Sequence, residues 1–353
     1  MANKIIAAGH ICLDITPLFP AEKTGAVADL LLPGTLLRME GADVHTGGSV
    51  ANTGLALRFF GAETELMGKV GDDAFGKMIL DILAAHDCKS NSMVVERGGV
   101  SSYSVVLAIP GQDRIFLHAP GVNDSFCCAD LDFDRIAEAK HFHFGYPPLM
   151  KKMYEHGGAE LAALFRRVKE LGLTTSLDMA AVDPSSEAGR QDWKEILRTV
   201  VPYVDYFLPS AEELCFMLDR ERYAEWTTRG GDVTATLEIE RDIRPLADEL
   251  LAMGAHTLII KCGAKGLYYR TGETEGFQKS FVPEKVCSAT GAGDTCIAAF
   301  LAAITEGRSL ENAVALAAAA GASCVSAYDA LGGLKPLGVL EAMIAAGWKT
   351  QEV

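Results

Sequence analysis

The chain has 353 residues, and its 32 basic and 47 acidic side chains give a formal charge of −15 at pH 7. So large an acidic excess argues against nucleic acid or an anionic membrane as a partner, because both bind through a basic face. A small polyanion is still compatible with this composition, since backbone N–H groups at a helix N-terminus can hold a phosphate.

The cysteines and the apolar segments indicate a reducing compartment and no membrane span. Nine cysteines form an odd set without a Cys-x-x-Cys pair, which favours reduced thiols over a disulfide framework or a zinc site. The apolar run at 5–9 is too short for a signal peptide. The apolar stretch 313–328 has 16 residues, fewer than the roughly 18 that suggest a membrane-spanning helix. We therefore predict a cytoplasmic protein.

The first 120 residues mix an α/β pattern with two candidate β-ribbons. The hydrophobic pattern predicts a buried strand at 5–8 and helices at 50–60 and 75–86. Two segments with Gly-Gly and Pro-Gly turns, 31–45 and 94–118, predict β-ribbons. Ribbons inserted into an α/β chain often cover the sheet edge where ligands bind. We therefore expect a β-rich lid formed by about 12–46 and 94–120.

From about Lys140 onward, short β-rich runs alternate with longer helical runs. The predicted strands are 141–145, 174–178, 204–208 and 257–262, and the predicted helices are 152–171, 190–199, 210–218 and 243–253. After Gly291 the chain is predicted to be helical almost to its end. Strands that are apolar on both faces and alternate with helices indicate a mostly parallel sheet covered on both sides. We therefore predict a three-layer α/β/α sandwich, a single domain over 1–353 that includes the lid.

The segment Ser-Ala-Thr-Gly-Ala-Gly-Asp-Thr at 288–295 gives the strongest chemical signal. Its small residues let the backbone approach a ligand closely, and the helix that follows presents unpaired N–H groups and the positive end of its dipole. Such a site suits anionic oxygens. Asp294 then stands beside it, either as a helix cap or as a catalytic group, and local chemistry leaves both interpretations open.

A second glycine segment, Thr-Gly-Gly-Ser-Val-Ala-Asn-Thr-Gly at 46–54, leads into an apolar helix. Gly47 and Gly48 indicate a flexible joint or a close approach to a ligand. Asn52 offers donors and an acceptor to a polyhydroxylated substrate. By itself, an ordinary polar residue at a helix start is the simpler interpretation.

Together these segments resemble the ribokinase, or PfkB-type, family of carbohydrate kinases. The stretch 47–76 has that family's Gly-Gly, Ala-Asn and Gly-x-Val-Gly-x-Asp-x-x-Gly patterns, and 290–294 matches its Thr-Gly-Ala-Gly-Asp loop. Between them, 261–266 is similar to the family's nucleotide loop and 208–213 to its metal-side Asn-x-x-Glu motif. Four motifs in the family's order, spread over nearly the whole chain, imply a ribokinase-like fold.

The resemblance implies catalytic roles for the loop at 290–294. Asp294 matches the base that takes a proton from the substrate hydroxyl as it attacks the γ-phosphate of ATP. The backbone N–H groups around Gly291, Ala292, Gly293 and Asp294 match the anion hole for the transferred phosphoryl group. Such a reaction depends mainly on positioning and electrostatics.

The resemblance also implies the residues that bind the nucleotide, the metal and the sugar. Glu213 matches the carboxylate that helps to hold Mg²⁺ through water. The positions that match nucleotide-binding residues are Gly263, Gly266 and Thr290, and those that match sugar-binding residues are Asp14, Gly47, Gly48, Asn52 and Asn123.

Two departures from the family's pattern concern its metal sites. Ser288 stands where the family often has an aspartate that supports a monovalent-cation site, which puts a potassium requirement in doubt. Ser210 replaces the asparagine of the Asn-x-x-Glu motif, so the magnesium shell is expected to be arranged differently. Neither change removes a residue that the chemistry requires.

The sequence thus predicts an ATP- and Mg²⁺-dependent sugar kinase that phosphorylates a hydroxyl, most simply a primary one, of a sugar or sugar derivative. A nucleoside or keto-deoxy sugar acid kinase of the same fold, or a catalytically silent sugar-binding regulator, stays open. A nicotinamide-dependent enzyme is disfavoured, because its glycine loop would follow the first strand. The lid ribbons suggest a homodimer, since exposed ribbon edges attract partners.

Four further polar residues need an interpretation. His141 and His143 alternate on a predicted strand as two metal ligands could, but no third ligand lies near them, so we expect structural roles. Arg114 is expected to reach the substrate from the lid. Asp178 ends a predicted strand, where it either faces the active site or starts a turn.

Overall fold

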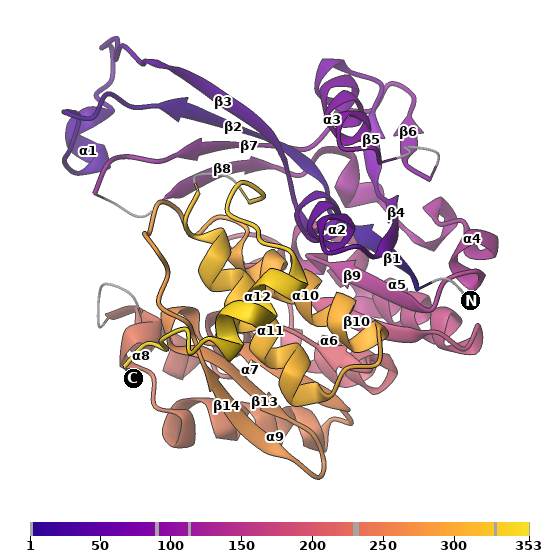
Figure 1. Ribbon diagram of the computed structural model, residues 1–353. Helices are drawn as coiled ribbons and strands as arrows, with labels where there is room; N and C mark the ends of the chain where they lie inside the picture. Colours follow the sequence, from indigo (N-terminus) through magenta and orange to yellow (C-terminus); the bar gives the residue numbers. More distant parts are fainter. Residues whose placement is uncertain (1–2, 89–91, 112–113, 229–232, 328–329, 353) are drawn as a thin grey trace.

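A large sheet covered by helices forms most of the molecule (Figure 1). The computed structural model describes residues 3–88, 92–111, 114–228, 233–327 and 330–352. The main sheet has the strand order β14-β13-β12-β11-β10-β9-β1-β4. In that order the strands are Glu275–Lys279, Gly266–Arg270, Thr257–Lys261, Tyr206–Phe207, Thr174–Asp178, His141–Gly145, Lys4–Gly9 and Glu63–Met67.

The main sheet is mostly parallel, as predicted. Strands β4, β1, β9, β10, β11 and β12 are parallel, whereas β13 and β14 add an antiparallel pair at one edge. The sequence analysis missed this pair. Both strands have five residues that include a glycine and at least one charged side chain, so they lack the long apolar run that marks a strand buried on both faces.

Alternate residues of the strands enter two separate cores. Ile5 and Ala7 pack with apolar residues of α2, α10, α11 and α12, whereas Ile6 and Ala8 pack with α5, α6, α7 and α9. These helices are Ser49–Phe59, Ala292–Thr305, Leu310–Cys324, Leu337–Ala345, Lys151–Glu170, Trp193–Val200, Ala211–Leu218 and Arg244–Ala252. The predicted three-layer α/β/α sandwich is therefore confirmed. No helix in the described ranges is both long and apolar enough to cross a membrane.

A second, four-stranded sheet projects from the main body at the upper left of Figure 1. We call it the small sheet, and its order is β3-β2-β7-β8. Its strands are Gly41–Gly47, Cys12–Leu18, Tyr103–Leu107 and Ile115–Ala119. All four fall inside the two segments that were expected to form the lid, but a lid function stays a prediction.

Within the small sheet, the predicted ribbon at 31–45 begins too early. Strand β3 starts only at Gly41, and its partner is β2. The sequence analysis missed β2 because Pro17 interrupts its pattern. Proline has no N–H to donate to a neighbouring strand. It is tolerated here because β7 pairs with β2 only over Leu13–Ile15. At Pro17, β3 is therefore the one partner strand in the described sheet.

Several other boundaries differ from the sequence expectations. In the predicted ribbon at 94–118, β6 (Val94–Glu96) pairs with β5 (Lys69–Gly71) outside the small sheet, and 112–113 lie outside the described residues. The helix predicted at 190–199 begins at Trp193, because Asp192 caps it by accepting the Glu195 N–H at 3.1 Å. The remaining α-helices are Val27–Leu30, Ala74–Ala85, Phe133–Ala137 and Arg220–Thr228.

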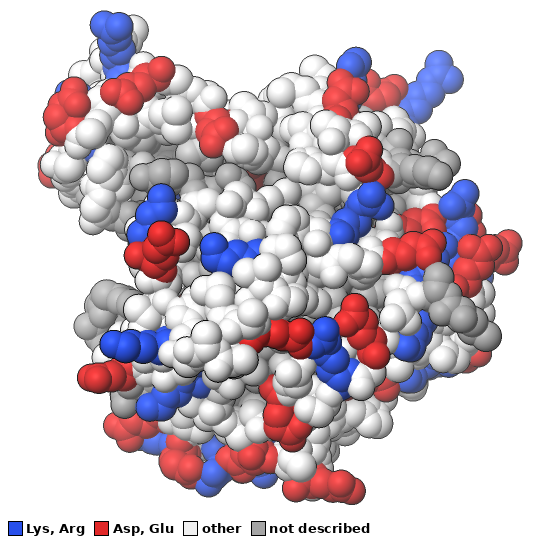
Figure 2. Space-filling model, in the orientation of Figure 1, with Lys and Arg blue, Asp and Glu red and all other residues white. Residues whose placement is uncertain are grey.

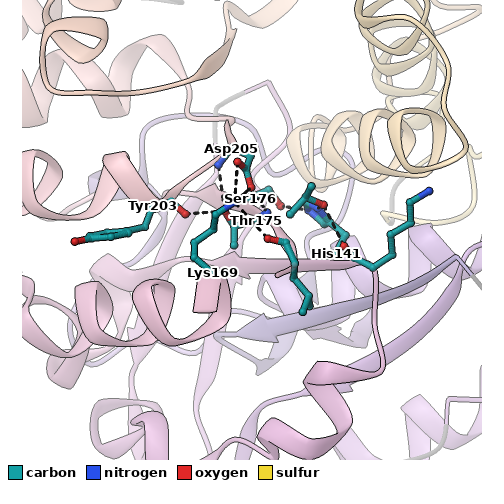
Figure 3. Close-up of polar contacts among 9 residues, drawn as sticks. His141, Lys169, Thr175, Ser176, Tyr203 and Asp205 are labelled. Atoms are coloured by element: carbon teal, nitrogen blue, oxygen red, sulfur yellow. Dashed lines mark hydrogen bonds and ion pairs between the residues drawn. The ribbon is translucent and has the colours of Figure 1, made fainter. Parts of the chain in front are cut away.

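A polar network joins the amino ends of β9, β10 and β11 (Figure 3). Asp205 accepts hydrogen bonds from Lys169 Nζ at 2.9 and 2.7 Å, from the Thr175 N–H at 2.8 Å and from Thr175 Oγ1 at 3.1 Å. The Asp205 N–H in turn donates to Thr175 Oγ1 at 3.1 Å, and β11 is Tyr206–Phe207, shorter than the strand predicted at 204–208.

His141 lies at this amino end of the sheet, and His143 lies in the middle of β9. His141 lies 2.8 Å from Thr174 Oγ1 and 2.7 Å from Ser176 Oγ, and His143 contacts Ser176 and Ser49 at 2.8 and 3.2 Å. All four ring nitrogens therefore have partners within the fold. The described part of the chain contains no group of three or more residues arranged to hold a metal ion.

Candidate active site

Polar side chains lie at the carboxyl ends of the parallel strands, the edge at which α/β proteins bind ligands. His10 follows β1, Tyr146 follows β9, Asp178 ends β10 and Lys261 ends β12. Tyr146 contacts Asp294 directly, and Lys261 lies close enough for its positive charge to lower the pKa of Asp294. The fold thus assembles one polar cluster around the first turn of α10.

Asp294 is held by three donor side chains, two of them neighbours on α2 and the third after β9. Its side chain accepts the Tyr146 hydroxyl at 2.9 Å (Oδ1) and 2.8 Å (Oδ2), Thr53 Oγ1 at 3.1 Å and Asn52 Nδ2 at 3.1 Å. Asp294 is only 4% exposed. Since both carboxylate oxygens accept hydrogen bonds, the orientation of the carboxylate is fixed.

The surroundings of Asp294 affect its pKa in opposite directions. Burial raises the pKa of Asp294, because a buried carboxylate loses its hydration. The Tyr146 hydrogen bond, the positive charge of Lys261 and the hydrogen bonds from Asn52 and Thr53 lower it, but burial has the larger effect. The result is a carboxyl group with a raised pKa, which suits a group that must take up a proton.

A buried ion pair lies beside Asp294. Lys261 Nζ is 2.6 Å from Asp178 Oδ1, and the two side chains are 14% and 1% exposed. Burial lowers the pKa of Lys261, but Asp178, Glu213 and Asp294 together raise it by more, so the ammonium group stays charged. A side chain at Gly293 would begin 3.7 Å from Lys261 Nζ. The ammonium group therefore borders the loop that was expected to bind phosphate, and Asp178 faces the active site.

The loop before α10 presents backbone N–H groups at the same place. Gly291 caps the helix with φ of 71°, a conformation that favours glycine. The Ala292 N–H donates to Ala289 O at 3.3 Å. It is therefore not free to bind an anion, contrary to the expectation from the sequence. Within the described residues, no backbone carbonyl or side chain accepts a hydrogen bond from the N–H of Gly293 or Asp294, which makes these two the candidates for an anion hole.

Glu213 and Thr290 already have partners in the fold. Glu213 accepts the Ser210 N–H at 2.7 Å, and Ser210 Oγ accepts the Glu213 N–H at 3.2 Å, which forms a capping box on α7. The Thr290 hydroxyl lies 2.8 Å from Ser288 Oγ, which Arg114 Nη1 contacts at 3.5 Å. Arg114 thus reaches from the small sheet to the loop before α10.

Gly263 and Gly266 lie in the turn between β12 and β13. A side chain at Gly263 would begin 2.2 Å from Thr234 Oγ1, and one at Gly266 would begin 2.0 Å from Gln278 O. Packing within the protein therefore already requires both glycines. Their nucleotide-binding role stays a prediction.

The residues expected on the sugar side divide into two groups. Asp14 lies against Gly47, where a side chain would begin 2.2 Å from Asp14 Oδ2, and Gly48 caps α2, which carries Asn52. Asn123 is different, because its fully buried amide donates to Ile11 O at 2.8 Å and accepts the Ile11 N–H at 3.4 Å. The structure gives Asn123 a role in holding the segment after β1 and leaves its side chain no exposed atom for a sugar.

The sequence analysis missed three residues of this site, Tyr146, Thr53 and Lys261. Lys261 and Tyr146 could have been found from their positions at the ends of predicted parallel strands. Tyr146 carries a second signal, since it precedes two prolines and has a φ of 66°, which is uncommon for a residue with a large side chain. Thr53 follows Asn52, but nothing local indicates that both would reach Asp294.

Comparison with known proteins identifies the family of the chain. The family model for pfkB family carbohydrate kinases matches residues 11–335. The chain belongs to this family. Fructokinase-2 of Oryza sativa subsp. japonica is 25% identical over 360 residues, which cover 97% of this chain and 94% of that protein. Probable fructokinase-5 of Arabidopsis thaliana is 27% identical over 346 residues, with 94% of each chain covered.

A solved structure of a related fold extends the comparison to three dimensions. Arabidopsis thaliana ribokinase complexed with ribose and ATP has a TM-score of 0.73 and 19% identity, with 98% of this chain and 99% of that chain covered. At this identity the likeness concerns the fold alone. The ribokinase-like fold and the carbohydrate kinase class predicted from the PfkB motifs are thus confirmed.

Proposed function

We propose that this PfkB-family protein transfers the γ-phosphoryl group of ATP to a hydroxyl, most simply a primary one, of a sugar or sugar derivative. The geometry around Asp294 carries the proposal. A carboxylate with a raised pKa, oriented by three donor side chains, lies next to two unpaired N–H groups and the buried ammonium of Lys261. In this mechanism Asp294 takes the proton of the acceptor hydroxyl as that oxygen attacks phosphorus.

The positive groups have a separate task in this proposal. The N–H groups of Gly293 and Asp294 stabilise negative charge on the transferred phosphoryl group, as an anion hole does. Lys261 adds a positive charge that is already desolvated and held by Asp178. Both contributions are strongest in a buried site, where water screens charges least.

ATP and Mg²⁺ would bind on the C-terminal side of this cluster. The fit to Mg²⁺ is acceptable, because Glu213 supplies a carboxylate, and Mg²⁺ usually keeps waters and substrate phosphates as its other ligands. When bound, Mg²⁺ would neutralise phosphate charge. Glu213 would hold it through water, and Gly263, Gly266 and Thr290 would contact the nucleotide. The ATP complex of Arabidopsis ribokinase supports this assignment through the shared fold.

The sugar would bind between Asp294 and the small sheet, which we propose acts as a lid. Asp14, Gly47, Gly48 and Asn52 lie on this side of Asp294. The hydrogen bond between Asn52 and Asp294 adds a positioning role to its expected contact with the sugar. The contact of Arg114 with Ser288 supports closure of the small sheet over the phosphate loop.

An exchange of one atom tests the proposed base. Asp294→Asn keeps the shape of the side chain but cannot accept a proton, so turnover should fall by about 10³-fold or more, with ATP and sugar binding retained in calorimetry. The matched control is Asp205→Asn at the opposite end of the sheet, which should leave turnover within twofold. Turnover of Asp294→Asn within tenfold of the unaltered protein would show that Asp294 is not the base.

The acceptor is found by measuring ADP release over a panel of sugars, nucleosides and keto-deoxy sugar acids. We expect turnover with a sugar. Release with a nucleoside or a sugar acid would favour the kinases of those compounds, and sugar binding without any ADP release would favour a silent regulator.

A homodimer through the small sheet and a cytoplasmic location complete the proposal. Strand β8 forms one edge of the small sheet, and its residues Ile115, Phe116 and Leu117 are 39%, 52% and 54% exposed. An exposed apolar edge strand favours pairing with another chain. Light scattering should give twice the mass of one chain, and a monomer at micromolar concentration would contradict the dimer.

A further inference from the structure

Two neighbouring histidines, His10 and His118, each have one ring nitrogen without the partner that buried polar atoms normally have. His10 Nδ1 and His118 Nε2 are buried and accept or donate no hydrogen bond within the described residues, and His10 is 1% exposed overall. Folded proteins leave few buried polar atoms unpaired, because each costs about 1–3 kcal/mol. An unpaired pair at a candidate active site therefore needs an explanation.

Both rings belong to the sugar side of the site. The His10 ring lies 6.2 Å from the Tyr146 ring and 5.1 Å from the His118 ring. A side chain at Gly48 would begin 2.6 Å from His10 Nδ1. His10 thus stands between the phenol that contacts Asp294 and the glycine that caps α2.

His118 is one of four residues in a row across the small sheet. Strand pairing places His45 beside Asp14, Asp14 beside Ser104 and Ser104 beside His118, so their side chains share one face. Burial raises the pKa of Asp14, and the negative charge of Asp294 adds to this effect. The row therefore faces the catalytic cluster.

The hydrogen bond of Ser102 determines which nitrogen of His10 carries the proton. Ser102 Oγ donates its single hydrogen to Ala119 O at 2.8 Å. Ser102 Oγ can therefore only accept from His10 Nε2, 3.4 Å away, so Nε2 carries the proton and Nδ1 the free lone pair. Burial lowers the pKa of His10 far below its usual range, which keeps the ring uncharged.

The same reasoning applies to His118. Ser104 lies beside Asp14 on the same face of the small sheet, and its hydroxyl lowers the pKa of Asp14, which it does by directing its hydrogen at the carboxylate. His118 Nδ1, 3.1 Å from Ser104 Oγ, is then the donor, and Nε2 carries the free lone pair. Burial also lowers the pKa of His118. Both unpaired nitrogens are thus hydrogen-bond acceptors on uncharged rings.

Most of the side chains on this side of the site are acceptors. Asp14 and Asp294 carry carboxyl groups, and Tyr146 gives its single hydrogen to Asp294. Asn52 gives one of its two amide hydrogens to Asp294, and Lys261 is paired with Asp178. A ligand with several hydroxyl donors would satisfy this wall of acceptors, whereas a carboxylate or phosphate group would face lone pairs and negative charge.

We propose that His10 and His118 are specificity residues that accept hydrogen bonds from the hydroxyls of a neutral sugar and thereby reject sugar acids and sugar phosphates. This inference rests on the proposed function, which supplies the position of the acceptor. Because neither nitrogen is exposed, the sugar reaches them when the small sheet moves. His118 belongs to that sheet and His10 follows a strand of the main sheet, so movement separates the two rings.

The test compares His118→Leu, which removes the acceptor atom, with His118→Gln, which keeps one. With a neutral sugar such as D-fructose or D-ribose, His118→Leu should raise the KM for the sugar about tenfold or more and leave the KM for ATP within twofold. His118→Gln should recover most of the loss. The matched control is His45→Leu at the other end of the row, whose ring is paired with Asp43 at 2.8 Å and half exposed.

Two results would overturn the inference: a sugar acid such as D-gluconate used better than the neutral sugars, or a sugar KM of His118→Leu equal to that of His45→Leu. Calorimetry of sugar binding without ATP separates this inference from the proposed function. If no acceptor gives ADP release but the neutral sugar binds and His118→Leu weakens that binding tenfold, the inference holds and the proposed function fails. If no neutral sugar binds the unaltered protein, the inference fails.

Discussion

The amino and carboxyl ends of the main sheet both gather charged and hydrogen-bonding side chains, but they use them differently. At the amino end, Asp205 receives hydrogen bonds from Lys169 and Thr175, and both nitrogens of His141 are paired (Figure 3). At the carboxyl end, two histidine nitrogens and two backbone N–H groups lack partners within the described residues. Closed networks stabilise a fold, whereas unpaired groups around a fixed carboxylate are suited to a ligand.

The comparison also explains how an acidic protein can use ATP. On the face shown in Figure 2, basic and acidic side chains are intermixed, without a continuous basic area. The proposed phosphate site depends instead on Lys261 and on two N–H groups at the start of α10. Phosphate binding should therefore depend on this local arrangement and on Mg²⁺, with little contribution from the surface charge.

Among variants that keep the Asp294 carboxyl group, the largest expected effect comes from removing the ammonium group at the carboxyl end. Lys261→Met should lower kcat/KM about 100-fold, comparable to the loss of an anion-hole donor, and should also destabilise the protein because Asp178 is left buried and unpaired. The double variant Lys261→Met/Asp178→Asn should recover the free energy of unfolding in urea without recovering activity. Recovery of both would show that the pair is only structural.

Tyr146→Phe should change the pH dependence. The Tyr146 hydrogen bond lowers the pKa of Asp294, so its removal raises that pKa further. A base works only when deprotonated, so activity is lost as the pH falls through its pKa. The acidic limb of the profile of kcat/KM against pH should therefore move to higher pH, with a larger loss at pH 6 than at pH 8. Tyr203→Phe at the amino end is the control, and equal profiles for both variants would contradict a positioning role for Tyr146.

At the amino end, the expected effect is on stability alone. Asp205→Asn loses the charge that Lys169 and Thr175 contact, which should lower the free energy of unfolding by about 2 kcal/mol. The value of kcat/KM should stay within twofold. Urea unfolding and ADP release on the same preparation check both, and a large fall in activity without loss of stability would remove the distinction between the two ends.

The smallest expected effect concerns potassium. Ser288 is a neutral residue whose hydroxyl lies 2.8 Å from Thr290 Oγ1 and 3.5 Å from Arg114 Nη1. Such a residue cannot supply the negative charge that would favour a monovalent cation there. Replacing sodium by potassium in the assay should change kcat by less than twofold. Activation of about fivefold or more would require a cation site built from other residues.

Much of the fold could be predicted because its signals are local. Apolar runs bounded by glycine marked most of the parallel strands, and the serine at 210 with the glutamate at 213 is a capping box that correctly starts α7. The wrong predictions concern strands whose formation depends on the neighbouring strand more than on their own residues. Strand β2 contains a proline, which is acceptable because the pairing with β7 ends before it. The β13–β14 pair has no strong apolar pattern.

For the site, the sequence by itself determined the loop of small residues and the aspartate at the start of the helix that follows it, because these depend on neighbouring residues. The tertiary structure alone decided what surrounds them. Tyr146 reaches Asp294 across 148 residues of chain, Lys261 meets Asp178 across 83, and Asn123 turns inward to hold Ile11. Such contacts depend on the order of strands in the sheet and on how helices pack over it, and no local pattern encodes that order.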